Sequence, residues 1–147
     1  MSVIKIGLDV HGVINKDPDL FRRLTTHLRK NGVEIHILTG VEIGDLLLKE
    51  LSNIGVEYDH LFSITSYHKS IGTYITYKND DKTQPLIAPP KWNRSKADYA
   101  KKVGLHIHLD DSPLYKEYFH WSTQYVIYTD EVRRFLKTMV GGYGRIS

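Results

Sequence analysis

The sequence predicts an α/β fold in which a mainly parallel sheet of about five strands is covered by helices on both faces. Two observations predict this arrangement. Short β-rich runs alternate with amphipathic helical stretches along the chain, and parallel strands need such crossover helices between them. The chain has 147 residues with 41% hydrophobic content, which is enough for one core. We therefore expect a single domain over 1–147, built as a doubly wound three-layer sandwich.

The first part of the chain reads as strand, helix, strand, helix. Residues 3–6, which are apolar except for Lys5, predict a strand that leads to Asp9. A helix follows, with an N-cap and a first-turn proline at Asp17-Pro18 and an end at Asn31-Gly32. Residues 33–38 form the second β-rich run. The next helix closes at Gly55, and its apolar face consists of Ile43, Leu46, Leu47, Leu51 and Ile54.

The second part of the chain contains a segment without a clear period. A weak strand over 60–65 precedes residues 66–92, which mix tyrosines, lysines and prolines and predict an irregular insert. The remaining patterns predict regular elements and a loose tail. They are a helix over 95–104, a strand over 105–109, a helix from Ser112-Pro113 through Phe119, a strand over 124–128, a helix over 130–139 and a glycine-rich tail over 141–147.

The composition excludes several classes of chemistry. There is no cysteine, so disulfides, thiolate zinc sites and thiol nucleophiles are absent. No apolar run reaches the roughly 20 residues of a membrane span, and the N-terminus lacks a signal-peptide layout, so we expect a cytoplasmic protein without membrane contact. The net charge of +3 permits an anionic partner such as a nucleotide or nucleic acid.

Three strand ends carry polar side chains. The first strand leads to Asp9, the second to Thr39, and the fourth to Asp110-Asp111. Ligands of parallel α/β sheets bind outside the carboxyl ends of the strands, so these residues are expected to lie together. Carboxylates brought together repel each other unless a cation lies between them, and hard oxygen ligands suit Mg²⁺. The pattern predicts a magnesium site that also takes a phosphate.

Other residues near these strand ends suit the phosphate. The Thr39 hydroxyl can donate to a phosphoryl oxygen, and so can the amide of Gly40, which we expect at or near a helix start. Lys96, expected at the head of its helix, would shield the phosphate from the carboxylate of Asp9. Lys91 is the alternative lysine, but it does not stand at the start of the helix that leads to Asp110.

Four segments in this order resemble the motifs of the haloacid dehalogenase-like (HAD) hydrolase superfamily. They are "LDVHGV", "ILTG", Lys96 within "RSKADYAKKVGL", and "IHLDDS", and the resemblance spans residues 3–113. It implies a Rossmann-like fold and a magnesium-dependent phosphohydrolase that works through an aspartyl-phosphate. The short intervals between the motifs resemble small capless, nucleotidase-like members.

The resemblance also assigns roles to residues. Asp9 would be the nucleophile and a metal ligand, and the backbone carbonyl of His11 would bind magnesium. The remaining implied metal residues are Asp110 and Asp111, and the implied phosphate-binding residues are Thr39, Gly40 and Lys96.

One position departs from the family pattern. The second aspartate of the first motif, which serves as general acid and base, is His11 here. With an ordinary pKa of about 6.5, a histidine can exchange protons near neutral pH. The sequence therefore leaves two alternatives open: a phosphatase with shifted chemistry, or a catalytically attenuated HAD-like protein that binds a phosphate or nucleotide.

The substrate is expected to be a small-molecule phosphoester or nucleotide, or a nucleic-acid end. A capless site is open to large substrates, and the insert interleaves aromatic with basic residues that can stack bases and hold phosphates. Packing of these rings onto the sheet explains the same residues and is the preferred interpretation. The residues are Tyr67, Tyr74, Tyr77, Trp92, His68, Lys69, Lys78, Lys91 and Arg94.

Three histidines lie within the predicted strands. His106 and His108 alternate on the face that carries Asp110, which suits either a transition-metal site or buried hydrogen-bonded side chains. The second interpretation is preferred because both faces of a parallel sheet are covered. His36 receives the same interpretation.

Overall fold

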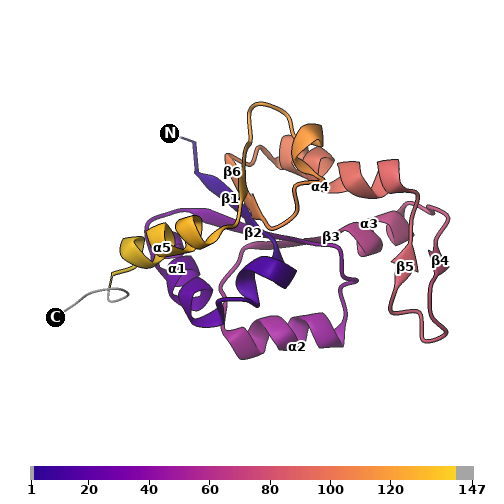
Figure 1. Cartoon of the computed structure of the whole chain (residues 1–147), viewed down its shortest axis with the longest axis horizontal. Coiled ribbons are helices and arrows are strands. Elements are labelled where there is room, and N and C mark those ends of the chain that lie inside the picture. The colour runs from indigo at the N-terminus through magenta and orange to yellow at the C-terminus, as the bar shows by residue number, and fades with distance from the viewer. Residues whose placement is uncertain (1, 142–147) are drawn as a thin grey trace.

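The computed structural model describes residues 2–141 and contains one five-stranded, entirely parallel sheet in the order β3-β2-β1-β6-β7 (Figure 1). This confirms the predicted fold class. Chain order reverses direction across β1, so the carboxyl ends of β1 and its neighbours meet at one edge of the sheet. The strands are β1 (Lys5–Leu8), β2 (Glu34–Thr39), β3 (His60–Ser63), β6 (Ile107–Asp110) and β7 (Gln124–Ile127).

Helices cover both faces of this sheet and complete the three layers (Figure 1). The first face carries α1 (Pro18–Lys30), α2 (Asp45–Ile54) and α5 (Asp130–Met139), and the second carries α4 (Pro89–Val103), which contacts α3 (Ile64–Ser70). Within the described residues, no helix combines the length and apolar character needed to cross a bilayer.

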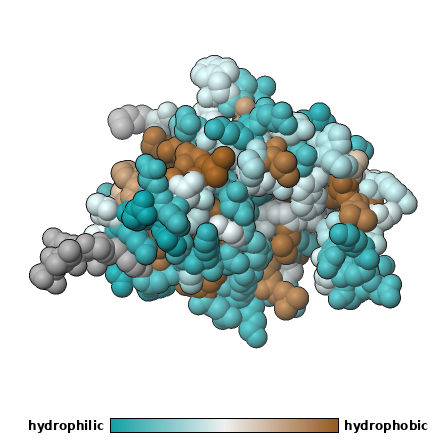
Figure 2. All heavy atoms as spheres, viewed as in Figure 1, coloured by the Kyte–Doolittle hydropathy of each residue, from teal (hydrophilic) through white to brown (hydrophobic). Residues whose placement is uncertain are grey.

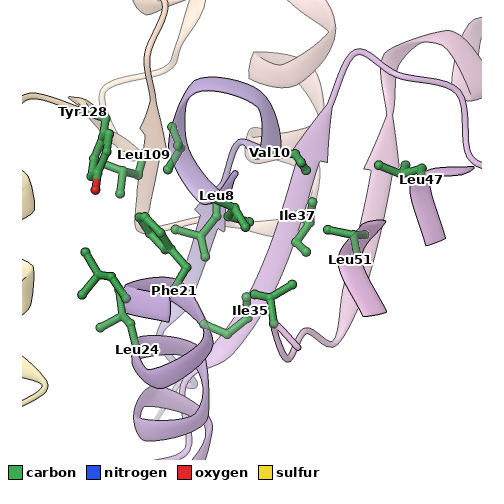
Figure 3. Packing of buried hydrophobic residues seen from close by; sticks show 14 residues of the cluster. Leu8, Val10, Phe21, Leu24, Ile35, Ile37, Leu47, Leu51, Leu109 and Tyr128 are labelled. Carbon is green, nitrogen blue, oxygen red and sulfur yellow. The ribbon is translucent and has the colours of Figure 1, made fainter. Parts of the chain in front are cut away.

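Alternation along β2 divides the core between the two faces. Ile35 and Ile37 point toward α1 and α2, where they join the main cluster of buried side chains shown in Figure 3. Leu38 belongs instead to a smaller cluster on the α4 side. Phe21 of α1 is fully buried in the main cluster and its ring lies 5.6 Å from that of Tyr128. Because side chains alternate along the strand, β2 packs against the helices on both faces of the sheet.

The segment predicted as an irregular insert contains regular structure. The expected strand over 60–65 stops at Ser63, because the Ser63 hydroxyl accepts a hydrogen bond from the Ser66 amide at 3.0 Å and caps α3. An antiparallel hairpin follows, formed by β4 (Thr76–Tyr77) and β5 (Pro85–Leu86). The two prolines at 89–90, predicted to lie in the insert, form the first turn of α4. The helix expected over 95–104 therefore begins earlier.

The segment after Asp111 and the start of the first strand also differ from the predictions. The helix predicted from Ser112 through Phe119 is only a 3₁₀ turn, η2 (Lys116–Tyr118). The Ser112 amide donates to Asp110 Oδ1 at 3.0 Å, which directs the chain away from a helical path. The first strand begins at Lys5, and Val3 and Ile4 are half exposed. Most of the predicted loose tail, residues 142–147, lies outside the described residues.

We expect the replacement Phe21→Ala to lower the free energy of unfolding by about 3–5 kcal/mol, because it leaves a cavity beneath the sheet. The matched change Phe135→Ala, at a side chain that is 63% exposed on α5, should cost about 0.5 kcal/mol or less. Urea denaturation followed by circular dichroism measures both. Equal losses would show that Phe21 does not hold the core.

Candidate functional site

Asp9 follows the last residue of β1 and is held at the edge of the sheet. Its amide donates to the Leu109 carbonyl at 3.0 Å, which extends the pairing of β1 with β6 by one residue. The chain then forms a wide turn over Val10–Ile14, in which Gly12 has a φ of +97°. Only glycine adopts this conformation without strain. The Asp9 side chain is therefore fixed, with 7% of the residue exposed.

Lys96 joins Asp9 to Asp110, the last residue of β6. Its ammonium lies 3.1 Å from Asp9 Oδ1 and 2.7 Å from Asp110 Oδ2. All three residues are buried. The sequence correctly predicted that these residues converge, but Lys96 does not stand at the head of its helix, because α4 begins at Pro89. Lys91, the alternative lysine, is exposed.

The charges in this cluster affect one another strongly. Burial raises the pKa of Asp9 to about 7. Lys96 acts in the opposite direction, and the carboxylates of Asp110 and Asp111 add to the increase. Burial also opposes the charged form of Asp110, but the hydrogen bond from His108 and the charge of Lys96 lower the pKa of Asp110. Burial of Lys96 is outweighed by the two carboxylates, which raise the pKa of Lys96. One buried ammonium group therefore neutralises only part of the charge of two acids, and a further cation would be favourable at this site.

Asp110 is held by groups that the sequence did not assign to the site. His108 lies on the same face of β6, and its Nε2 is 2.9 Å from Asp110 Oδ2. The His108 ring is fully buried and stacks on Phe119 at 5.3 Å. The prediction of a buried, hydrogen-bonded His108 is confirmed. His106 is half buried, and its Nδ1 accepts from the Lys5 amide at 3.0 Å.

Asp111 completes a group of three carboxylates. One oxygen from each of Asp9, Asp110 and Asp111 lies within 4.8 Å of the others. Asp111 is exposed and sits against the backbone of Gly12, where a Cβ atom would overlap its carboxylate. Hard oxygen donors from two strand ends, with solvent on one side, match the coordination preference of Mg²⁺. The donor set therefore fits the ion that the sequence predicted.

Thr39 and Gly40 lie at the carboxyl end of β2 beside this cluster. The Thr39 hydroxyl accepts from the Val41 amide at 3.1 Å and keeps its own proton to donate. Gly40 is not at a helix start, since α2 begins at Asp45, so the dipole of that helix does not act on it. Trp92 instead packs against Gly40 in the space that a Cβ would need.

A cavity of about 620 Å³ opens above these residues. All the predicted site residues line it, and its outer walls come from the β4–β5 hairpin and the start of α2. The polar turn of the hairpin, residues 78–84, projects from the body at the right in Figure 2. The predicted members are Asp9, His11, Thr39, Gly40, Lys96, Asp110 and Asp111, and the hairpin contributes Tyr77, Lys82, Thr83 and Pro85.

The His11 side chain pairs with a residue that the sequence did not indicate. Its Nε2 lies 3.0 Å from Glu50 Oε1 on α2, and both side chains are partly exposed. The two residues are 39 positions apart in the sequence, so no local pattern predicts this contact. Tyr115 was also missed: its hydroxyl accepts from Trp92 Nε1 at 3.1 Å, and its ring lies 5.1 Å from the Lys96 ammonium.

Comparison with known proteins gives little beyond this geometry. No protein family model matches the chain, and no curated protein matches it either. One solved NMR structure that is similar is described as the core domain of a putative phosphoglycolate phosphatase from Streptococcus pneumoniae TIGR4. The two share 13% sequence identity with a TM-score of 0.48, over 94% of this chain and 98% of the other. Function is therefore inferred from the side chains of the site.

The contact between Gly12 and Asp111 generates a prediction. Gly12→Ala and Gly32→Ala both place alanine at a positive φ, which costs about 1–3 kcal/mol, but Gly32 has no neighbour within 4 Å of the added methyl group. We expect Gly12→Ala to weaken Mg²⁺ binding as well, because it displaces Asp111. Calorimetric titration measures the binding, and urea denaturation measures stability. An unchanged Mg²⁺ affinity in Gly12→Ala would show that Asp111 does not take part in binding the ion.

Proposed function

We propose that this chain is a magnesium-dependent phosphohydrolase of the HAD-like type, which acts through an aspartyl-phosphate on a nucleotide or another phosphoester. The observation that carries the proposal is the buried ammonium of Lys96 between Asp9 and Asp110 at the carboxyl edge of the sheet. A lysine buried between two acids serves no packing need, since apolar side chains fill such a space at less cost. The arrangement suits a site that handles a dianion and a dication.

The carboxylates of Asp9, Asp110 and Asp111, with the backbone carbonyl of His11, would hold Mg²⁺. When bound, the ion supplies Lewis-acid polarisation of the phosphoryl group and neutralises charge on it. Asp110 keeps acceptor capacity on Oδ1 beyond the bond from the Ser112 amide. His108 fixes the orientation of the carboxylate from the protein side.

Asp9 is the nucleophile in this proposal. One carboxylate oxygen attacks phosphorus, the ester oxygen leaves, and the phosphoryl group stays on Asp9 until water releases it. Lys96 keeps Asp9 oriented and offsets the repulsion between carboxylate and phosphate. The Thr39 hydroxyl and the Gly40 amide donate to the phosphoryl oxygens.

His11 is the candidate acid and base, with Glu50 as its positioning partner. The contact of Nε2 with the Glu50 carboxylate holds the imidazole of His11 in place. The Nδ1 proton is then available for the leaving oxygen, and neutral Nδ1 can later accept a proton from water. The His11–Glu50 pair thus replaces the missing aspartate.

The size of the cavity supports a substrate as large as a nucleotide. About 620 Å³ lies within the usual range of roughly 300–1,000 Å³ for small-molecule sites and admits a nucleotide. Trp92, Tyr77 and Tyr115 offer aromatic surface on its walls, while Lys82 adds a positive charge. A nucleic-acid end is an alternative substrate, since the site opens to solvent.

A second candidate function is phosphate or nucleotide binding without turnover. The exposed position of His11 favours it, because an acid that is bonded to Glu50 in solvent is less well placed than a buried one. Turnover distinguishes the two functions, while binding is common to both.

We expect the wild-type protein to hydrolyse members of a phosphoester panel only with Mg²⁺, and Asp9→Asn to lose this activity while it stays folded. Asp59→Asn, which changes an acid at the opposite edge of the sheet, is the matched control. Release of inorganic phosphate measures turnover. Nucleotide binding without any hydrolysis in the wild type would support the second candidate function instead.

His11→Ala should slow the hydrolysis of alkyl phosphates by about a hundredfold or more, because their leaving groups need a proton. Aryl phosphates, which leave without one, should be much less affected. Glu50→Gln should give a smaller loss of the same kind. Steady-state rates on matched alkyl and aryl substrates measure the difference, and an equal effect on both would exclude the acid role of His11.

A further inference from the structure

A second group of metal-ligating side chains lies at the opposite edge of the sheet. Glu34 begins β2 and His60 begins β3, whereas Asp9 follows the last residue of β1 and Asp110 is the last residue of β6. Glu34 and His36 are two residues apart on one strand, so both face α4. His60 pairs in register with His36 on the neighbouring parallel strand and faces the same way. Strand geometry alone therefore brings the three side chains together.

We propose that Glu34, His36 and His60 form a binding site for a divalent transition-metal ion of the Zn²⁺ class. One donor atom from each residue lies within 4.8 Å of the other two. Glu34 Oε2 lies 2.6 Å from His36 Nε2, and Glu34 Oε1 lies 3.9 Å from His60 Nε2. Tetrahedral zinc with bonds of about 2.0–2.1 Å separates its ligand atoms by roughly 3.3 Å. The two observed separations, one to each oxygen of Glu34, lie on either side of this value.

The orientation of His36 is already fixed as a metal would need it. The side chain is 2% exposed, and its Nδ1 lies 2.7 Å from the hydroxyl of Tyr99 on α4. When Nε2 binds a metal, Nδ1 must carry the ring proton and donate it to an acceptor. A tyrosine hydroxyl can both donate and accept, so it serves the ring in either tautomer. Tyr99 is in turn held by stacking on Phe62 at 4.5 Å.

Access and donor type determine which ion fits. The His60 side chain is 53% exposed, which gives an ion a path from solvent and leaves a coordination position for water. Two imidazoles with one carboxylate favour Zn²⁺, Co²⁺, Ni²⁺ or Cu²⁺ over Mg²⁺. This site therefore differs in chemistry from the all-oxygen group at Asp9, Asp110 and Asp111.

Lys5 opposes cation binding and provides a sensitive test. Its ammonium lies 3.9 Å from Glu34 Oε2 while it donates to the Val103 carbonyl at 2.8 Å. Lys5→Gln removes the charge and retains a donor for that carbonyl. The replacement should therefore strengthen metal binding at Glu34, which a nonspecific surface site elsewhere would not show.

The experiment titrates untagged, EDTA-treated protein with Co²⁺ in excess Mg²⁺, which competes at the all-oxygen site. We expect one Co²⁺ per chain with visible absorption bands, and displacement by Zn²⁺. His60→Ala and Glu34→Gln should abolish the bands, Tyr99→Phe should weaken binding by about tenfold or more, and Lys5→Gln should tighten it. His27→Ala, at an exposed histidine on α1, should change nothing.

Unchanged binding in both His60→Ala and Glu34→Gln would overturn the proposal, and so would the absence of visible bands in the wild type. A measurement on the wild type keeps the test independent of how the variants fold. Zn²⁺ should shift the imidazole NMR signals of His36 and His60 and leave those of His27 in place. Signals of His36 and His60 that do not respond to Zn²⁺ would equally exclude the site.

Discussion

The buried contact of Lys96 with Asp9 and Asp110 is the constraint on which the candidate active site depends. Each acid ends a strand, and neither can keep its charge beside the other in a dry environment without a cation. Lys96 supplies one positive charge, which brings α4 against the edge of the sheet and fixes both carboxylates. Burial still raises the pKa of Asp9, and the two buried acids outnumber the one lysine between them. That deficit makes the site suited to a further cation.

The parallel sheet explains why chemistry gathers at its two edges. On the face under α1 and α2, strand centres carry apolar side chains that pack under the helices, as Figure 3 shows for Ile35, Ile37 and Leu8. Strand ends lie where helices no longer cover both faces, so polar side chains are tolerated there if they find partners. At the carboxyl edge the partners are acids and a lysine. At the amino edge, the two histidines and Glu34 partner one another.

Sequence reasoning succeeded where a local pattern determines position. Asp9, Thr39 and Asp110 were placed correctly because each follows an apolar run, and the carboxyl ends of parallel strands meet. It failed where contacts between residues far apart in the sequence determine the position of a side chain or an element. Glu50, which contacts His11, lies 39 positions after it in the sequence. The strands of the hairpin have two residues each, which is too short for a period to be detected. The early start of α4 is not evident from the sequence, because a pair of prolines is as typical of a loop as of the first turn of a helix.

The most direct test of the central contact is the free energy of unfolding of Lys96→Met with and without Mg²⁺, compared with Lys101→Met on the exposed face of α4. In EDTA, Lys96→Met should lose about 3–5 kcal/mol, because two buried acids are left without their cation. Mg²⁺ should restore part of this loss, while the control should lose little in either condition. A loss no larger than that of the control, with no response to Mg²⁺, would contradict the account.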